Sequence, residues 1–390
     1  MKSEWTTRSI SDIAEINPRE SISKGSIAKK IPMDVLQPFT RDVPGYQMEK
    51  FKGGTRFRNM DTIMARITPC LENGKTAQVR CLDNGEVGFG STEYIVFRAK
   101  EGTDPDYLYY LICSPLVRDP AIKSMVGSSG RQRVQTDVVA NLQIAVPDFD
   151  EQKNIGGLLK ALDDKIQLNT AINKNLEQQA QTLFDNFYDS LSGQSCILSE
   201  IIDIRDGTHD SPKATEHGYP LVTSKHLLPF GVDTSSANII SKADYDKVNE
   251  RSKVNTGDIL ISMIGTVGLI SYVIDSPVEF AIKNVGLFKT SQHPSLDLYI
   301  LYYLKNKSTT QHIENCLAGS TQKYISLGEL RKLPIVVPSP DELAAYNLVV
   351  RPIVSEIALL VQENRRLSDL RDTLLPKLMS GELDVSGLDI

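Results

Sequence analysis

Two stretches of the chain carry apolar residues at steps that alternate between four and three positions. In residues 151–192 this seam consists of Ile155, Leu159, Leu162, Ile166, Asn169, Asn173, Leu176, Ala180, Leu183 and Phe187. In residues 339–381 it consists of Tyr346, Val350, Ile353, Ile357, Leu360, Asn364, Leu367, Arg371, Leu374 and Leu378. A seam of this period over more than about 25 residues is typical of a coiled coil. The pattern therefore predicts two long helices that pack on each other.

Both stretches have recognisable helix ends. Residues 148–151 (Asp-Phe-Asp-Glu) and 339–342 (Ser-Pro-Asp-Glu) fit a capping box, in which an acceptor side chain precedes the helix and Glu follows three residues later. Ser192-Gly193 and Ser380-Gly381 supply the glycine that often follows a helix. At about 1.5 Å per residue, helices of this length would make a spacer of roughly 60 Å.

Two asparagines interrupt the apolar seams at equivalent places. Asn173 and Asn364 are expected to share a layer of the helix pair. An Asn in such a seam costs stability but fixes the register of the helices. Together with Leu176 and Leu367, these residues are our candidates for helix register and for an interface with partner proteins.

The segments that precede the two helices repeat each other, about 191 residues apart. Leu142-Gln-Ile-Ala-Val-Pro147 returns as Leu333-Pro-Ile-Val-Val-Pro338, and Leu108-Tyr-Tyr-Leu111 returns as Leu301-Tyr-Tyr-Leu304. Short β-branched or aromatic runs in each half, bounded by glycine, predict strands. A repeat this long indicates two domains, each followed by one helix, and not a solenoid.

The predicted fold class is α+β. Two α/β domains are separated by two long antiparallel coiled-coil helices, and an internal repeat gives pseudo-two-fold organisation. The expected boundaries are residues 1–150 for the first domain, 151–192 for the first spacer helix, 193–338 for the second domain, 339–381 for the second spacer helix and 382–390 for a C-terminal tail. Such a chain should bind something that is itself two-fold.

Composition narrows the class of protein. The chain has 390 residues, of which 41% are hydrophobic and 24% are charged, an ordinary balance for a soluble protein. No apolar run approaches the ~18 residues of a membrane helix, and no signal-peptide core follows Met1, so we expect no membrane association. Five scattered cysteines favour the reduced cytoplasm.

The net charge of the chain is compatible with nucleic-acid binding only at local basic surfaces. A net charge of −6 argues against a general polyanion binder. Two basic runs stand out against this background, although solvated surface is an equally simple interpretation of each. They consist of Lys50, Lys52, Arg56, Arg58 and Arg66, and of Arg118, Lys123, Arg131 and Arg133.

Catalytic signatures are present only as near misses. Residues 72–76 (Glu-Asn-Gly-Lys-Thr) resemble the end of a P-loop, but Pro69 stands where its first glycine is required. No Gly-x-Gly loop follows a strand to hold S-adenosylmethionine or a dinucleotide. The five histidines lack the spacing of metal ligands. We therefore expect no catalytic site, no cofactor and no metal in this chain.

The ordered set of motifs resembles the specificity subunit of type I restriction–modification systems, over essentially the whole chain. The residues that carry the resemblance are 127–134 with 142–147, Asp206-Gly-Thr-His-Asp-Ser-Pro212 with 218–225, Gly319-Ser-Thr-Gln-Lys-Tyr-Ile325 with 333–338, and Leu374-Leu-Pro-Lys-Leu-Met-Ser-Gly-Glu-Leu383. Arg131-Gln-Arg133 stands where the second copy has Gln322-Lys-Tyr324, which suggests that the two halves read different DNA sequences.

The resemblance implies a function that the residues alone do not give. Such a subunit is not catalytic. Its two target-recognition domains bind an asymmetric, split target on double-stranded DNA, and its helices recruit two adenine methyltransferase subunits, which restriction/translocase subunits can join. S-adenosylmethionine, ATP and magnesium would then be bound by those partners. Two alternatives stay open, a coiled-coil scaffold and a self-contained DNA-modifying enzyme.

The candidate DNA-binding residues are polar or basic and lie in loops. Arg, Lys, Gln and Ser can donate hydrogen bonds to base edges and phosphates, and Gly127, Gly130 and Gly319 allow the backbone to approach DNA closely. The candidates are Lys52, Arg56, Arg66, Ser128, Ser129, Arg131, Gln132, Arg133, Thr208, His209, Lys225, Ser320, Thr321, Gln322, Lys323 and Tyr324.

Overall fold

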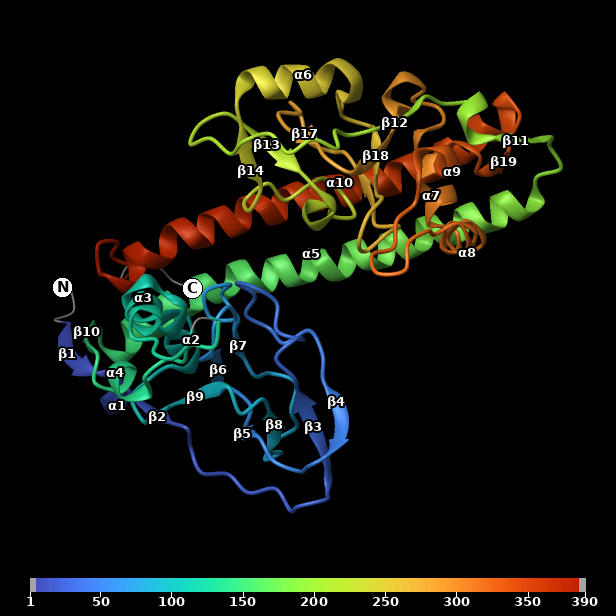
Figure 1. Cartoon of the computed structure of the whole chain (residues 1–390). Helices are drawn as coiled ribbons and strands as arrows, with labels where there is room; N and C mark the ends of the chain where they lie inside the picture. The colour runs from blue at the N-terminus through green and yellow to red at the C-terminus, as the bar shows by residue number, and fades with distance from the viewer. Residues whose placement is uncertain (1–4, 129, 386–390) are drawn as a thin grey trace. The chain divides into compact units, whose positions relative to one another are not determined.

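The computed structural model describes residues 5–128 and 130–385, so Ser129 and the end of the expected tail, 386–390, lie outside the described residues. The chain forms two compact units (Figure 1). The first comprises Met1–Leu168 together with Asn364–Ile390, and the second comprises Asn169–Glu363. This division passes through both long helices, so each unit contains half of each.

The first unit is built mainly from short strands. A four-stranded sheet has the order β2-β9-β6-β7, a second has the order β4-β3-β8-β5, and β1 pairs with β10. The elements are β1 (Thr6–Ser9), α1 (Ile10–Ile13), β2 (Ala14–Ile16), β3 (Ile27–Ile31), β4 (Gln47–Lys50), β5 (Thr55–Phe57), β6 (Thr62–Ala65), β7 (Thr76–Gln78), β8 (Gly88–Gly90), β9 (Tyr94–Ala99), α2 (Pro105–Cys113), α3 (Pro115–Lys123), α4 (Thr136–Ala140) and β10 (Gln143–Val146).

The second unit has corresponding elements. Its sheets have the orders β12-β18-β15-β16 and β14-β13-β17, and β11 pairs with β19. The elements are β11 (Ser195–Ile197), η1 (Leu198–Glu200), β12 (Ile204–Asp206), β13 (Tyr219–Val222), η2 (Ser224–His226), β14 (Asn238–Ile240), α6 (Lys242–Ser252), β15 (Ile259–Ser262), β16 (Ile270–Tyr272), β17 (Ala281–Ile282), β18 (Val285–Phe288), η3 (Thr290–Gln292), α7 (Asp297–Lys305), α8 (Lys307–Asn315), α9 (Leu327–Arg331) and β19 (Pro334–Val336).

The strand order confirms the sequence repeat and the mixed α/β class of each domain. The order β2-β9-β6-β7 matches β12-β18-β15-β16 element for element, and β1-β10 matches β11-β19. The parallel pair β3·β8 corresponds to the parallel pair β13·β17. In each unit three helices follow, and their tyrosine pairs, Tyr109-Tyr110 and Tyr302-Tyr303, are buried core residues.

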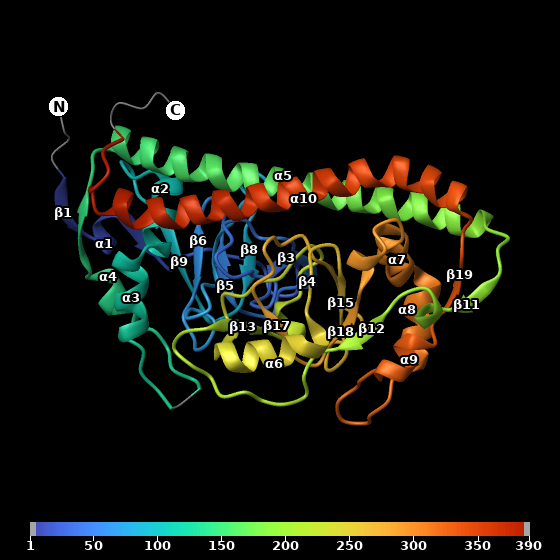
Figure 2. The same ribbon diagram turned by 90° about the horizontal axis from the view of Figure 1, so that it is seen from above.

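The two long helices are α5 (Phe149–Ser190, 42 residues) and α10 (Pro340–Met379, 40 residues). They lie side by side and antiparallel (Figure 1 and Figure 2). In the first unit Arg371 forms an ion pair with Asp163 at 2.7 Å. In the second unit Phe187 stacks on Tyr346 with 4.8 Å between ring centroids. Residue numbers rise along α5 as they fall along α10, which is the predicted antiparallel arrangement.

The expectation that Asn173 and Asn364 share a layer is wrong. Asn364 donates to the carbonyl of Ile166 in the first unit, whereas Asn173 belongs to the second unit. The buried seam amide is Asn169, which donates to Glu363 at 2.7 Å. Equivalent positions of a repeat face each other only at the centre of an antiparallel pair, so the repeat alignment could not place these two residues together.

The predicted helix caps are present. The backbone N–H of Glu151 donates to Asp148 at 2.9 Å. At the second helix, Ser339 and Glu342 bond each other reciprocally, at 2.8 and 3.3 Å, which is a complete capping box. Gly381 follows α10 with a left-handed φ of +71°.

The predicted glycine stop at Gly193 has a different physical basis. Its φ is not left-handed; instead an added Cβ would lie 2.6 Å from the carbonyl oxygen of Val337. Gly193 is therefore explained by the close approach of two backbone segments and not by a left-handed helix end.

One helix among the described residues, α10, is long and apolar enough by length and composition to cross a membrane, which the sequence reading did not anticipate. Core helices of soluble proteins pass the same test. Five of its residues, Leu343, Tyr346, Val350, Val354 and Ile357, are buried in the core of the second unit. Its apolar character is accounted for in part by this packing.

Candidate nucleic-acid interface

Two exposed loops occupy corresponding places in the two units. Loop 1 is Val126–Arg133 and loop 2 is Ala318–Tyr324; loop 1 leaves the end of α3 and loop 2 precedes α9 (Figure 2). Both are closed in the same way. Val126 and Arg133 exchange backbone hydrogen bonds of 3.0 and 2.9 Å, and Ala318 and Tyr324 exchange two of 2.9 Å. The closure fixes the base of each loop, and the described residues between the two closing pairs are exposed, apart from the half-buried Gln132.

Each loop base is also bonded to the segment that follows a central strand. The N–H of Thr68, after β6, donates to Gln132 at 3.0 Å, and the N–H of Gly265, after β15, donates to Lys323 at 3.1 Å. These bonds hold each loop at the end of its four-stranded sheet. Because both units make the same contacts, the loops are structural equivalents with different side chains.

Glycine is required where each loop begins. Gly127 has a φ of +133° and Gly319 a φ of +92°, both in the region that favours glycine. A Cβ on Gly319 would lie 2.3 Å from the carbonyl oxygen of Gln322. The tight turn, and not only a close approach to DNA, therefore explains these two residues.

Loop 2 presents its predicted DNA-binding residues fully. Ser320, Thr321, Gln322, Lys323 and Tyr324 are all exposed, and the residue Tyr324 is 44% exposed. A large exposed ring beside amide and ammonium groups can stack on a base or sugar while its neighbours donate hydrogen bonds. The structure thus gathers these five residues on one surface.

Loop 1 divides its basic residues into two kinds. Arg131 is exposed, as is Ser128, and Gln132 is half-buried. Arg133 forms a bidentate ion pair with Glu93, which directly precedes β9: Nε donates to the carboxylate at 2.9 Å and Nη2 donates at 2.6 Å. These hydrogen bonds lower the pKa of Glu93 from its ordinary value, so the pair is held in its charged form at neutral pH.

The earlier basic run is not one surface. Lys52 is exposed, Arg56 lies over the ring of Phe51, and Arg58 forms an ion pair with Glu20. Arg66 is half-buried and donates weakly, at 3.4 Å, to the carbonyl of Val134 beside loop 1. Of the five members of this run, Lys50 and Lys52 are exposed without an ion-pair partner among the described residues, as phosphate contacts require.

In the second unit, Thr208 and His209 line a cavity of about 480 Å³ beside α6. The ring of His209 is bonded to Asn284 at 2.8 Å and to Asp206 at 3.0 Å, and Arg251 also pairs with Asp206. Asn284 directly precedes β18, as Glu93 precedes β9. Sequence reasoning did not single out either residue; in the structure each directly precedes a strand of the repeat.

Lys225 is connected to loop 2 by contacts of the preceding residue, Ser224. It is exposed, and the hydroxyl of the preceding Ser224 donates to the carbonyl of Ile264 at 3.3 Å. Ile264 is itself bridged to Tyr324 at the base of loop 2. The structure therefore brings Lys225 and loop 2 to the same end of the sheet.

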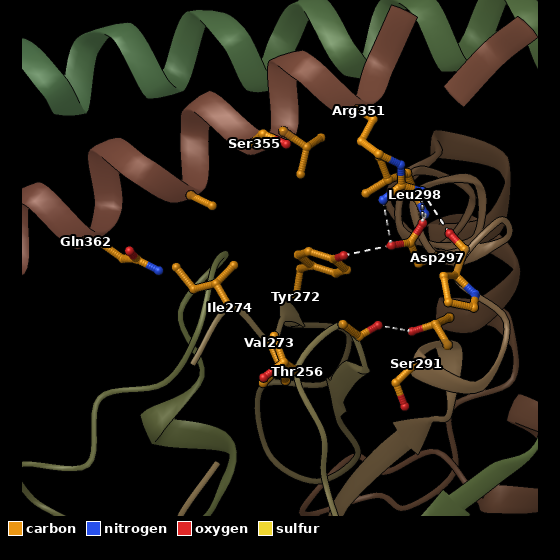
Figure 3. A pocket seen from close by; sticks show the side chains of 15 residues that line it. Thr256, Tyr272, Val273, Ile274, Ser291, Asp297, Leu298, Arg351, Ser355 and Gln362 are labelled. Atoms are coloured by element: carbon orange, nitrogen blue, oxygen red, sulfur yellow. Dashed lines mark hydrogen bonds and ion pairs between the residues drawn. The ribbon is translucent and has the colours of Figure 1, made fainter. Parts of the chain in front are cut away.

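A second cavity of the second unit, about 370 Å³, lies between α10 and the sheet (Figure 3). In it the hydroxyl of Tyr272 donates to Asp297 at 2.8 Å and Arg351 pairs with the same carboxylate at 2.7 Å. Burial, together with the charge of Asp297, raises the pKa of Tyr272, so the phenol stays protonated. The network neutralises a buried carboxylate and connects α10 to the start of α7.

Of the residues predicted to set helix register, Asn173 and Leu176 belong to the second unit, and Asn364 and Leu367 belong to the first. Leu176 packs against the core of the second unit, and Leu367 is half-buried. The amide oxygen of Asn173 is buried without a hydrogen-bond partner in the part of the chain that the structure describes. No group of three or more His, Cys, Asp and Glu residues suited to a metal occurs among residues 5–128 and 130–385.

Comparison with known proteins identifies the family. The family model for the type I restriction modification DNA specificity domain matches residues 2–178 and 196–343. The HindI specificity subunit of a type I restriction enzyme from Haemophilus influenzae is 22% identical, with 88% of this chain and 89% of the relative aligned. The MjaIX specificity subunit from Methanocaldococcus jannaschii is 23% identical, over 74% of this chain and 71% of its own.

A solved structure supports the fold. The type I restriction–modification S subunit from M. genitalium has a TM-score of 0.54 at 15% identity, over 97% of this chain and 96% of that one. The chain belongs to the type I restriction–modification DNA specificity family, with two matches to its domain. It is therefore a specificity subunit, the chain that recognises a DNA sequence, as the order of its motifs suggested.

Proposed function

We propose that each domain reads one half of a bipartite, asymmetric DNA target and that α5 and α10 set the gap between the halves. The observation that carries this proposal is the pair of loops. They are closed by the same backbone bonds but present different side chains, Arg131-Gln-Arg133 in one and Gln322-Lys-Tyr324 in the other. One scaffold with two different surfaces suits a target whose two halves differ.

The finer account of partners also belongs to this proposal. The chain itself would be non-catalytic and cytoplasmic. It would recruit two adenine methyltransferase subunits, which restriction/translocase subunits can join. These partner subunits together would bind S-adenosylmethionine, ATP and magnesium. Exposed apolar side chains on the helices support such an interface. Leu348, Val349 and Leu359 on α10 are 79%, 52% and 61% exposed, and exposed apolar side chains that gather on one element can form an interaction site.

Sequencing of methylated adenines in cells that express the chain with its methyltransferase partner tests the proposal. We expect one motif made of two specified halves and an unspecified gap of constant length. Methylation without the partner, together with S-adenosylmethionine binding by the purified chain, would instead indicate a self-contained enzyme. Absence of sequence-specific binding by the assembled complex would indicate a scaffold.

Arg131 should contribute a phosphate contact. Replacing Arg131 with Ala should weaken binding to every DNA sequence alike and reduce the magnitude of the log–log salt slope by about 0.9, because one counterion fewer is released. Affinity is measured across a salt series. Lys100→Ala is the matched control: it removes one charge at the opposite end of β9 from Glu93, roughly 20 Å along the strand. Equal slopes in the two variants would remove Arg131 from the DNA contact.

Asn173 should cost stability without setting the gap. Replacing Asn173 with Leu should raise the free energy of unfolding by about 1 kcal/mol, because the buried amide oxygen has no partner among the described residues. The methylated motif should keep its gap, since Asn169–Glu363 and Asp163–Arg371 still pair the helices. Thermal unfolding and methylated-adenine sequencing measure the two effects. If the variant methylates motifs with mixed gap lengths, Asn173 does set the register of the helices.

A further inference from the structure

We propose that Arg133 reads a guanine in the half-site of the first domain, and that Glu93 is the positioning residue that aims it. The proposal rests on the proposed function, in which loop 1 contacts DNA, and it assigns Arg133 a role different from that of Arg131. It also names the base that one position of the unknown target should contain.

The first step of the argument is the geometry of the guanidinium. An arginine side chain has five N–H donors in a planar fork. Glu93 occupies the edge formed by Nε and Nη2, at 2.9 and 2.6 Å. The opposite edge, one N–H of Nη1 and one of Nη2, stays available and points away from the carboxylate. Two parallel donors are what the O6 and N7 acceptors of guanine bind in the major groove.

The second step is the exposure of the pair. The side chain of Arg133 is 48% exposed and that of Glu93 is 24% exposed, so the fork lies at the surface while its support is partly covered. Exposed ion pairs contribute little to stability. Glu93 precedes β9 and Arg133 closes loop 1, so the ion pair connects the loop to the rigid sheet. This connection would fix the orientation of the guanidinium, in addition to holding the loop in place.

The third step is the contrast with neighbouring positions. Arg131 has no carboxylate partner among the described residues and can turn toward any phosphate. In the second unit, Tyr324 stands at the position equivalent to Arg133 and has no N–H fork. Asn284 stands at the position equivalent to Glu93 and is hydrogen-bonded to His209. A residue before the corresponding strand thus supports a polar side chain in both units, but only the first unit has an aimed arginine. The guanine should therefore lie in the first half-site.

Two variants of the full chain, assembled with its methyltransferase partner, test the proposal. Arg133→Lys keeps the charge but loses the fork, because lysine is a point charge on a flexible stem. It should lower the preference for guanine at one position of one half-site by about 5-fold to 150-fold, with the salt slope unchanged. Glu93→Gln should relax the same position by a smaller factor, since Arg133 then keeps its donors but loses its fixed orientation.

The readout is binding and methylation of a set of targets that carry each base at each position, with thermal unfolding of each variant and Lys100→Ala as the control. Relaxation of a single guanine in the first half-site by both variants supports the proposal. A uniform loss of affinity, with a slope reduced by about 0.9 in Arg133→Ala, would make Arg133 a phosphate contact. Unchanged specificity, or relaxation at a position that is not guanine, would also overturn it.

The same experiment separates this inference from the proposed function. If the wild-type complex shows no bipartite specificity, the proposed function fails. If the wild-type complex is specific and Arg133→Lys leaves the first half-site intact, only the reading by Arg133 fails.

Discussion

Replacing Asp258 with Ala should lower the free energy of unfolding of the second domain by about 3–5 kcal/mol, the usual cost of removing one partner from a buried ion pair. Asp258 pairs with Lys289, and the two side chains are 0% and 4% exposed. The carboxylate also accepts the backbone N–H groups of Asn255 at 2.7 Å and of Ser291 at 3.0 Å. Without it, the ammonium of Lys289 stays buried and still donates to the carbonyl of Lys253 at 3.0 Å, but it has lost its carboxylate partner.

Urea unfolding of the purified chain measures the loss, and the repeat supplies a matched control. Asp61 occupies the same place before β6 and pairs with Arg98, whose side chain is 27% exposed. Asp61→Ala should cost less, because the guanidinium can be hydrated. Replacing both Asp258 and Lys289 with Leu should recover most of the loss, since no uncompensated charge remains. An equal or smaller effect of Asp258→Ala than of Asp61→Ala would contradict the assignment of this pair as the more deeply buried one.

The sequence predicted the features of this fold that depend on local pattern. A heptad seam, a capping box and a repeated strand–helix order are each encoded within a few residues of where they act, and they correspond to α5, α10 and the matching sheets. The layers in which Asn173 and Asn364 lie could not be predicted in this way, and the expectation that the two share a layer was wrong. A shared layer depends on how two helices are aligned, and periodicity does not carry that information.

The partner of an apolar seam is equally invisible to periodicity. Phe187 belongs to the predicted seam of α5 and Phe184 does not, yet both pack on Tyr299 of α7, with ring centroids 6.0 and 5.5 Å apart. The boundaries expected at 193 and 338 treat the helices as spacers outside the domains. In the structure each half-helix contributes to the core of one unit. An aromatic residue at a seam position can pack either on the other long helix or on the rest of its domain.

The candidate site was predicted as a set of loops but not as an arrangement of charges. Arg131 and Arg133 are indistinguishable by composition. What separates them is Glu93, 40 residues away in the chain and brought to Arg133 by the strand that it precedes. A long-range ion pair leaves no local signal, so only the structure could assign the two arginines different contacts.

The largest functional change should come from exchanging a whole domain. Replacing residues 195–335 with those of a relative that has a different target should change one half of the methylated motif and leave the other half and the gap unchanged. The reason is that each unit has its own cores. The cluster that contains Leu301 and Ile259 belongs to the second unit, and the cluster that contains Leu108 and Ile95 belongs to the first.

The structure also shows what such a graft must respect. Tyr299 packs on Phe184 of α5, and Tyr346 of α10 lies 6.3 Å from Tyr299 between ring centroids, so a donor segment limited to 195–335 has to fit helix residues that it did not evolve with. A second graft, of residues 169–363, carries these partners along and should be more stable at an unchanged helix length. Sequencing of methylated adenines is the measurement for both chimeras. If both half-sites change together in the longer graft, the two domains read DNA jointly. If the gap changes while helix length is kept, the spacing is set by the domains and not by α5 and α10.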